Sequence, residues 1–390
     1  MTRSTWKPQL FLLALVLVSC QRGEGVGDVI LHPTPNNIPI VTDPGFIIHD
    51  EPADTLEWLS AALREGHQIG VEDGASDKMI GQIWDVAIGG DLAYYVDYSY
   101  NFVRVYDFEG QLVDIIGSSG DGPGEFRFTT YVSVANADDD VHVVVGFSGH
   151  KVSVFSRSRN GEHVFQTTFR AVVPFLNGDL CAMQGHVYTT GYSEEINGVI
   201  HKHTLEGEYV SSFGMRYNHH NPFIRSQMTE GGSIECNATH HTLLYVHPYA
   251  PIATAFDESG DVSWQIKFSD ARIAPKQETI KSPGISSVMA LPPKVGESWG
   301  LSIVKGARGD SFWLSRRERQ SKERDRMADH FYQVNVLSGR GEYIGIRPIN
   351  LLLREESKKS VRAVDHERIY TTQSRPFPQL GIHPIPNEPR

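Results

Sequence analysis

A single stretch, residues 103–126, constrains the fold more than any other part of the chain. It reads VRVYDFEGQLVDIIGSSGDGPGEF. Apolar and polar residues alternate at its start, as they do in a half-buried strand, and Glu109-Gly110 marks a tight turn before a second apolar run. The chain then leaves through a glycine-rich crossing from Gly117 to Gly124. Two antiparallel strands followed by such a crossing are typical of the outer half of a β-propeller blade.

The turn at Gly110 recurs along the chain. Comparable glycines follow other strand-like segments, and the first three intervals between them are about 50 residues, which is the period of propeller blades. These turn glycines are Gly110, Gly161, Gly207, Gly260 and Gly339. The last interval is longer by roughly 30 residues. We therefore predict an insertion in the fifth blade at residues 269–298, a stretch rich in Pro, Lys and Ser.

Each repeat divides into four strand-like segments, and the first segment of each would line the channel of a propeller. The innermost strands are predicted at residues 84–88, 131–135, 179–183, 233–237, 300–304 and 360–365. The sixth repeat supplies only three strands, so an N-terminal strand is needed to complete it. Residues 57–69 contain the only candidate, with its strand expected at 66–69. Such closure joins the two ends of the domain and removes exposed sheet edges.

The sequence thus predicts an all-β fold, a six-bladed β-propeller over residues 54–390 whose last blade is closed by an N-terminal strand. One segment conflicts with this assignment. The stretch from Thr55 to Arg64 (TLEWLSAALR) has helical character, and the sequence leaves open whether it is a helix or part of the closing strand.

The N-terminus has the pattern of an export signal. Arg3 and Lys7 precede an apolar run at residues 10–18, which is too short to span a bilayer as a stable helix. The run ends in Leu17-Val18-Ser19-Cys20, which resembles a bacterial lipobox. The resemblance implies a lipoprotein signal peptide at residues 1–19 and lipidation of Cys20. The alternative is an ordinary secretory signal with a chance cysteine.

The lipobox also implies a location. A lipid-anchored chain would lie in the bacterial cell envelope, exposed to the periplasm or the exterior. Gln21 follows the cysteine, which by analogy with this class of signal favours the outer membrane. Residues 20–53 are rich in Gly, Pro and Asn and lack periodicity, so we predict a flexible tether there. The net charge of −11 argues against the basic surface that a nucleic-acid-binding protein needs, so no nucleic-acid partner is expected.

The motifs of the first repeat carry a family resemblance. They are Tyr95-Val96-Asp97, then Tyr106-Asp107-x-x-Gly110, then Ile116-Gly117 and the Gly122-Pro123-Gly124-Glu125-Phe126 crossing. This pattern resembles that of NHL-repeat propellers, and more closely that of six-bladed propeller lipoproteins of bacterial envelopes. The resemblance covers residues 54–390, strongly in the first repeat and weakly in the last two. It implies a fold and no catalytic residue, because the motif consists of turn and packing positions.

Two cysteines remain besides Cys20. Cys181 and Cys236 both fall in predicted innermost strands, and their repeats are consecutive. Inner strands of neighbouring blades converge on the channel, where the Cα separation that a disulfide requires can be met. An exported protein also lies in an oxidising compartment. We predict a Cys181–Cys236 disulfide, with two free buried thiols as the alternative.

Any metal or acid–base chemistry would lie along the channel. The acidic candidates on the inner strands are Asp85, Asp179 and Glu235. Calcium-dependent lactonases and related six-bladed propellers hold a metal with convergent carboxylates and amides. These three residues do not fall at matching positions of the repeats, so no metal site is predicted, and Ca²⁺ stays an alternative at the same three residues.

We predict a binding or interaction module that uses its blade-to-blade loops and the insertion to recognise an unidentified ligand. The expected partners are the membrane, through the N-terminal lipid, and an envelope protein, small molecule or glycan. An alternative is a metal-assisted hydrolase or lyase of lactone or amide-like substrates with its site in the channel. A third possibility is a structural component of the envelope. The sequence assigns no catalytic residue.

Overall fold

The structure is a computed structural model. It describes residues 29–32, 46–49, 54–55, 63, 66–74, 78–137, 140–158, 160–175, 177–217, 222–268, 272, 276–282, 285–290, 293–298, 300–306, 311–319, 327–337, 342–351, 359–365, 367–373 and 376–385.

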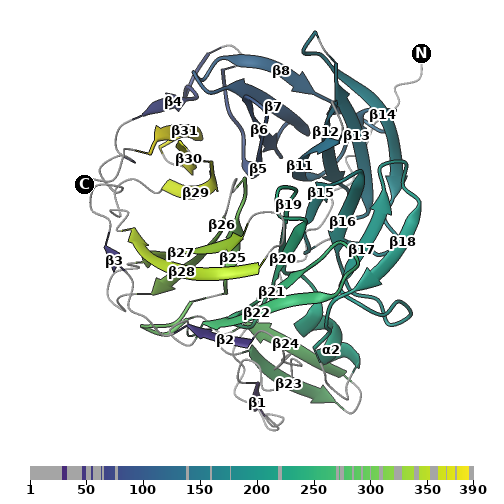
Figure 1. Ribbon diagram of the computed structural model, residues 1–390, viewed down its shortest axis with the longest axis vertical. Coiled ribbons are helices and arrows are strands. Elements are labelled where there is room, and N and C mark those ends of the chain that lie inside the picture. Colours follow the sequence, from purple (N-terminus) through teal and green to yellow (C-terminus); the bar gives the residue numbers. More distant parts are fainter. Residues whose placement is uncertain are drawn as a thin grey trace, which may run out of the picture.

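Six small sheets surround a central channel, which gives the six-bladed β-propeller that the sequence predicts (Figure 1). Each innermost strand contacts the innermost strand of the next blade, and the sixth contacts the first, so the ring is closed. The innermost strands of blades 1 to 6 are β5 (Ile83–Gly89), β11 (Thr129–Ala137), β15 (Leu180–Met183), β19 (Ser233–Asn237), β25 (Ser302–Val304) and β29 (Lys359–Val364).

The strands outside these follow in sequence order within each blade and pair antiparallel. They are β6 (Leu92–Asp97), β7 (Phe102–Asp107) and β8 (Leu112–Ile116) in blade 1; β12 (Asp140–Phe147), β13 (Lys151–Arg157) and β14 (His163–Arg170) in blade 2; β16 (His186–Thr190), β17 (Ile200–Thr204) and β18 (Tyr209–Phe213) in blade 3; β20 (Thr242–Val246), β21 (Ile252–Phe256) and β22 (Val262–Phe268) in blade 4; β26 (Ser311–Arg319), β27 (Met327–Leu337) and β28 (Glu342–Leu351) in blade 5; β30 (Arg368–Gln373) and β31 (Gln379–Pro384) in blade 6.

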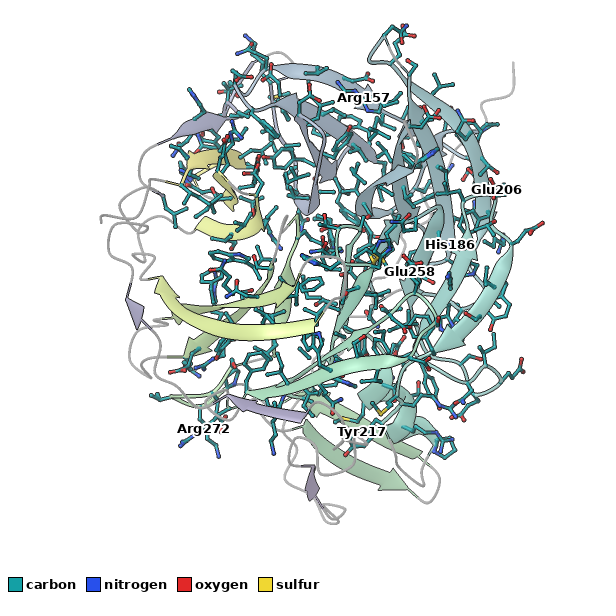
Figure 2. All side chains as sticks on the ribbon, in the orientation of Figure 1. Arg157, His186, Glu206, Tyr217, Glu258 and Arg272 are labelled. Atoms are coloured by element: carbon teal, nitrogen blue, oxygen red, sulfur yellow. A yellow bond between two sulfur atoms is a disulfide. The ribbon has the colours of Figure 1, made fainter. Side chains whose placement is uncertain are left out.

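The core lies between the blades. Successive side chains of a strand point to opposite faces, so each blade contributes apolar residues to both of its neighbours. In β6, Tyr94 and Val96 pack toward blade 2, whereas Tyr95 packs toward blade 6. Six clusters of buried apolar residues result, one at each interface between adjacent blades. Side chains fill the space between neighbouring sheets throughout the ring (Figure 2).

The repeated aspartate and glycine form the turns between third and fourth strands. Asp107 Oδ1 accepts a hydrogen bond from the backbone N–H of Gln111 at 2.7 Å, and Gly110 adopts a φ of 83°. Asp257 Oδ1 accepts from the N–H of Asp261 at 3.0 Å, beside Gly260 at a φ of 91°. The motif therefore recurs because a tight turn needs a side-chain acceptor and a residue that tolerates a positive φ.

An N-terminal strand closes the ring, as predicted. Strand β4 (His67–Ile69) pairs antiparallel with β31, with Ile69 opposite Leu380 and His67 opposite Ile382. It is the outermost strand of blade 6 and lies at the edge of the ring (Figure 1). Thr55 belongs to a strand, and Leu63 lies in a turn and is buried against residues of blades 5 and 6. The other residues of the segment with helical character fall outside the described residues.

Two more N-terminal strands add to the outside of blades 4 and 5. Strand β2 (Phe46–His49) runs parallel to β22, and β3 (Asp54–Thr55) runs parallel to β28. The range predicted as a flexible tether, residues 20–53, therefore contains two strands: β2 at residues 46–49 and β1 at residues 29–32. These segments pair because the outer strand of a blade presents unpaired backbone groups that another strand can satisfy. Cys20 and residues 1–19 lie outside the described residues.

The insertion after blade 4 contains a hairpin, β23 (Lys276–Ser282) and β24 (Ile285–Ala290). Strand β1 (Val29–His32) pairs with β23, and helix α2 (Pro222–Thr229) contacts β24. These elements project beyond the ring below blade 4 in the view of Figure 1. Within the described ranges, the structure contains no helix long and apolar enough to cross a bilayer.

Candidate functional site

A pocket of about 640 Å³ lies at the end of the channel where the inner strands begin, and all six blades contribute to its wall. Its lining residues are Trp84, Asp85, Tyr131, Asn177, Gly178, Asp179, Gly232, Ser233, Pro248, Gly300, Leu301, Ser302, Ile303, Lys305, Ser315, Arg316, Arg317, Phe331, Ser360, Val361 and Arg362. Several of these residues lie at the ends of the blade-to-blade loops. None of the described residues of the insertion lines the pocket.

Polar side chains on the inner strands join each blade to the next. Asp85 Oδ2 accepts a hydrogen bond from the N–H of Val132 in blade 2 at 3.0 Å. Ser133 Oγ accepts from Ala182 N–H in blade 3 at 3.0 Å. These residues act as inter-blade struts, because each satisfies a backbone donor that the neighbouring sheet leaves unpaired.

The same pattern continues around the ring. Asp179 Oδ2 accepts from the N–H of Ile234 in blade 4 at 3.1 Å, and Glu235 Oε1 accepts from Gly306 N–H in blade 5 at 3.3 Å. The three predicted acidic residues are thus brought to the channel, and all three serve as struts. Asp85 and Asp179 also line the pocket.

Lys305 occupies the centre of this acidic group and is 8% exposed. Its ammonium donates to Asp179 Oδ1 at 2.7 Å, to Leu180 O at 3.1 Å and to Ile234 O at 3.2 Å. Three acceptors match the three protons of an ammonium group, so its hydrogen-bonding capacity is satisfied. A buried charge with a full set of partners is the arrangement that low-dielectric surroundings tolerate.

The electrostatics of the group follow from its burial. Burial raises the pKa of Asp85 to about 6, and the charge of Lys305 offsets only part of this effect. Burial likewise raises the pKa of Glu235 to about 7. Burial would by itself lower the pKa of Lys305, but Asp179, Asp85 and Glu235 together raise it above its ordinary value. Asp85 and Glu235 therefore change their protonation state near neutral pH, whereas Lys305 stays charged.

The donor set does not fit a resident metal ion. Among the described residues, no group of three or more His, Cys, Asp or Glu side chains could hold one. The ammonium of Lys305 lies where a cation would bridge Asp179 to the carbonyl oxygens of Leu180 and Ile234. The positive charge that balances the channel carboxylates is thus that of Lys305.

Blades 5 and 6 form a basic wall on the pocket. Arg317 and Arg362 are both exposed, and Arg317 Nη2 donates to Ser360 Oγ at 3.4 Å. Arg362 Nε donates to Thr372 Oγ1 at 3.1 Å. Ser360 lies opposite Thr372 in the pairing of β29 with β30, so both arginines reach the same side of blade 6.

Arg316 begins the charged run Arg316-Arg317-Glu318-Arg319, which lies within strand β26. Arg316 is only 5% exposed, because β26 continues to Arg319 and pairs with β27. Its Nε donates to Tyr332 Oη at 2.8 Å, and its Nη1 forms an ion pair with Glu318. Alternate residues of the run face the interior because the strand continues, and a buried hydroxyl and carboxylate satisfy the guanidinium. Residues 320–326 fall outside the description.

Sequence reasoning missed Lys305 and the arginines, for different reasons. Lys305 ends the apolar segment Leu301-Ser302-Ile303-Val304, and a lone charge at the end of an inner strand is a signal that could have found it. Arg362 lies inside a predicted inner strand, so its position on the channel could also have been inferred. Arg317 depends on the length of β26, which a charged sequence does not reveal.

The predicted disulfide between Cys181 and Cys236 is present, with a Cα–Cα distance of 5.6 Å. It joins β15 to β19, the inner strands of blades 3 and 4. Cys181 lies two residues after Asp179, and Cys236 follows Glu235. The covalent link therefore fixes the two strands that hold two of the channel carboxylates.

Trp84 is the exposed aromatic residue of the pocket wall. It is 42% exposed, and its ring centroid lies 4.6 Å from that of Tyr98. Asp85 follows it on β5. The pocket thus has an aromatic and acidic side on blade 1 and a basic side on blades 5 and 6.

No protein-family model matches the chain, and no curated protein matches it. Solved structures that resemble it include a protein of Bacteroides fragilis described as exported, with a TM-score of 0.52 and 8% identity over 84% of this chain and 88% of that chain. Virginiamycin B lyase from Staphylococcus aureus gives a TM-score of 0.44 and 11% identity over 83% of this chain and 99% of that chain. At these identities, the similarity to the Bacteroides fragilis protein supports the six-bladed propeller fold and nothing finer.

Proposed function

We propose that this protein is a binding module of the bacterial cell envelope, whose ligand is a small molecule or a short part of a larger one bound in the channel pocket. The pocket of about 640 Å³ carries this proposal. Its volume falls within the range of small-molecule sites, and a rigid ring surrounds it. Serine hydroxyls, an amide, charged groups and aromatic faces from all six blades give it the polar groups that fix a ligand's orientation.

Binding accounts for the channel residues better than catalysis does. Asp85, Asp179 and Glu235 each accept a backbone hydrogen bond from the adjacent blade, so their positions are explained by the closure of the ring. A metal-assisted hydrolase or lyase would need carboxylates that converge on an ion, whereas these converge on Lys305. The proposal therefore assigns no reaction to the pocket.

A variant in which a larger side chain fills the pocket tests this function. The full chain, purified in detergent, is screened by thermal shift against sugars, amino acids, short peptides and organic acids. Ser302 is exposed on the pocket wall, so Ser302→Trp fills the pocket without disturbing the core. Ser119→Trp, at an exposed serine of the blade 1 crossing, is the matched control.

The expected result is a ligand that raises the melting temperature of the wild type and of Ser119→Trp, and has no effect on Ser302→Trp. Ligands that stabilise Ser302→Trp as strongly as the wild type would show that the pocket is not the binding site. A complete absence of ligands would count against a small-molecule site as well.

The cellular location is a separate part of the proposal. The lipobox residues support a signal peptide at 1–19 and lipidation of Cys20, and a structural neighbour is described as exported. Mature protein should start at Cys20 and carry acyl chains, which intact mass would reveal. Cys20→Ser should move the protein from the membrane fraction to the soluble fraction, since acylation supplies the anchor. A membrane-bound Cys20→Ser variant would contradict lipid anchoring.

A further inference from the structure

Aromatic side chains lie together at the pocket end of blade 1. Trp84 lines the pocket from β5, and its ring is next to that of Tyr98, in the loop that joins β6 to β7. Tyr100 is in the same loop, Phe102 begins β7, and Phe128 precedes β11 at the end of the crossing to blade 2. Since β6 ends where β5 and β7 begin, these residues share the face of the ring that contains the pocket. We call these five residues the aromatic platform.

The rings of Tyr100 and Phe102 are fixed from inside the protein. Their planes are 11° apart, and their centroids are separated by 5.5 Å. The guanidinium of Arg104, which is fully buried, lies 5.6 Å from the Tyr100 centroid and 4.9 Å from the Phe102 centroid. Arg104 in turn donates to Asp97 at 2.9 Å and to the carbonyl oxygen of Met79 at 2.6 Å. A buried ion pair thus holds both rings, so little conformational entropy is lost when a ligand stacks on them.

Phe128 has a backbone conformation that side-chain packing does not explain. Its φ is 53°, in the left-handed region that bulky residues rarely adopt, and its side chain is 61% exposed. Its N–H donates to Asn101 Oδ1 at 2.7 Å, and its carbonyl oxygen accepts from Ser148 N–H at 3.2 Å. Strained residues that the surrounding structure holds in place cluster at ligand-binding and active sites. The exposed ring of Phe128 is therefore a contact point for a ligand.

The charges beside the aromatic platform are balanced. Arg104 is paired with Asp97 inside the protein. On the surface, Arg127 forms an ion pair with Asp121 at 2.7 Å. A neutral ligand therefore suits the platform. An anionic lipid surface is a poorer match, because the net charge of −11 repels it.

The adjoining pocket indicates a ligand with many hydroxyl groups. Its wall carries an asparagine and four serines, which exchange hydrogen bonds with hydroxyl groups: Asn177, Ser233, Ser302, Ser315 and Ser360. The negative face of an aromatic ring attracts the C–H groups on the apolar side of a sugar ring. Flat aromatic faces next to hydroxyl-binding groups are thus the combination that a sugar requires.

We infer that the ligand is a chain of neutral sugars, one end of which lies in the pocket while the following sugar rings stack on the aromatic platform. The inference rests on the proposed function and adds the chemical class of the ligand and a second part of its site. Trp84 belongs to both the pocket and the platform, so one extended chain contacts both.

Sugar chains of two lengths test the inference. The probes are the disaccharides and hexasaccharides of cellulose, xylan, chitin and mannan, titrated into the full chain by calorimetry. A disaccharide fills the pocket alone, whereas a hexasaccharide also reaches the platform. For at least one of these sugars, the hexasaccharide should bind at least tenfold more tightly than the disaccharide, because its two contact regions are linked.

Two substitutions then assign the effect to the platform. Tyr100→Ala and Phe128→Gly should each weaken hexasaccharide binding about tenfold and leave disaccharide binding unchanged. Glycine tolerates a positive φ, so Phe128→Gly should lose affinity without a fall in melting temperature, which a merely structural role for Phe128 would not produce. Tyr209→Ala is the matched control, because Tyr209 is an exposed aromatic residue on β18 of blade 3 and does not line the pocket.

Vesicles of phosphatidylethanolamine and phosphatidylglycerol test a membrane as the occupant of the platform. The Cys20→Ser variant, which lacks the acylated cysteine, should not sediment with these vesicles. Sedimentation that the further change Tyr100→Ala abolishes would assign the platform to a lipid surface and overturn the inference.

The inference is also wrong if no hexasaccharide binds more tightly than its disaccharide, if no sugar chain binds at millimolar concentration, or if the platform variants bind hexasaccharides as the wild type does. Failure of the proposed function gives a different result. A ligand of another class whose binding Ser302→Trp abolishes and Tyr100→Ala leaves unchanged would preserve the binding pocket and reject the sugar chain.

Discussion

At the axis of the propeller, Lys305 supplies one positive charge to three carboxylates from three other blades. Asp179 is its direct ion-pair partner at 2.7 Å, and Asp85 and Glu235 interact with it at longer range. The backbone of Lys305 also bonds to blade 6, where its N–H donates to Arg362 O at 3.2 Å and its carbonyl accepts from Val364 N–H at 3.0 Å. Lys305 thus connects four blades, so its replacement should weaken the contacts among all four.

Replacement of Lys305 by methionine should destabilise the protein by about 3–5 kcal/mol, because it leaves the buried Asp179 carboxylate without a counter-charge. Chemical denaturation of the wild type and of Lys305→Met measures the difference. The double variant Asp179→Asn, Lys305→Met removes both charges and should recover much of the loss. Equal stability of the single variant and the wild type would contradict a structural role for this ion pair.

Glu235 should make stability fall as the pH rises. Burial raises its pKa to about 7 in the folded protein from an ordinary value of 4.5, so the folded state binds the proton more tightly than the unfolded chain. The resulting stabilisation is complete below pH 4.5 and is lost as the pH rises through 7, on the order of 1–3 kcal/mol. The raised pKa of Asp85, about 6, acts in the same direction over a lower range.

Glu235→Gln stays neutral, so its unfolding free energy should change less between pH 4.5 and 8 than that of the wild type. Glu206→Gln, at an exposed position, should follow the wild type across this range. If Glu235→Gln and the wild type lost the same stability over the interval, the carboxyl would have an ordinary pKa.

At the level of elements, the closing strand β4 depends on Gly66. This residue has a φ of 129°, and a Cβ there would lie 2.6 Å from Ile382 O and 2.7 Å from His383 Nδ1. Gly66→Ala should therefore weaken the pairing of β4 with β31 and destabilise the protein by about 1–3 kcal/mol. Thermal unfolding measures the change.

Gly161→Ala provides the comparison. Gly161 also has a positive φ, 91°, but a Cβ there would meet nothing within 4 Å. It incurs only the backbone strain, so its effect should be the smaller of the two. A larger loss of stability in Gly161→Ala than in Gly66→Ala would mean that the contact with blade 6 does not determine the effect of a side chain at position 66.

The disulfide links elements that other contacts also hold. Removing it in the double variant Cys181→Ser, Cys236→Ser should cost about 4 kcal/mol in the chain-entropy account, for a loop closed over 55 residues. The measurement is the free energy of unfolding of the oxidised wild type and of the variant. The reduced wild type should match the variant. A loss near zero would mean that the unfolded chain gains little freedom when the link is absent.

Elements whose signals are local could be predicted from the sequence, and elements that depend on distant partners could not. The innermost strands β15, β19 and β29 lie within one residue of their predicted bounds, because period-2 alternation and turn residues mark their ends. The positions of Asp85 and Asp179 on the channel followed from the same repeats. By contrast, β2 and β3 pair parallel to strands roughly two hundred or more residues away, and no local pattern reveals such a pairing.

For the molecule as a whole, strands β2 and β3 cover the outer edges of blades 4 and 5, whereas no other strand among the described residues pairs with the outer strands of blades 1 to 3. Deleting residues 29–55 keeps β4, so the ring should stay closed, but the outer strands of blades 4 and 5 would lose their partners. Uncovered strand edges pair with one another between molecules. The deletion variant should therefore self-associate in sedimentation velocity while its circular dichroism stays that of a β protein. A variant that remained monomeric at all concentrations would show that these edges need no cover.

The pairing of β4 with β31 also sets the order in which the protein can be completed. It joins Ile69 to Leu380, so the outer strand of blade 6 is among the first parts of the chain to be synthesised and its partner among the last. At about 5–20 residues per second, roughly 15 to 60 seconds separate the two. During that interval the flank of blade 1 that will meet blade 6, including Tyr95 and Ile88, has no partner. Until synthesis ends, the ring of a nascent chain is therefore unclosed, and the apolar face of blade 1 is exposed to solvent. A chaperone that binds exposed apolar strands can act on this face during most of the synthesis.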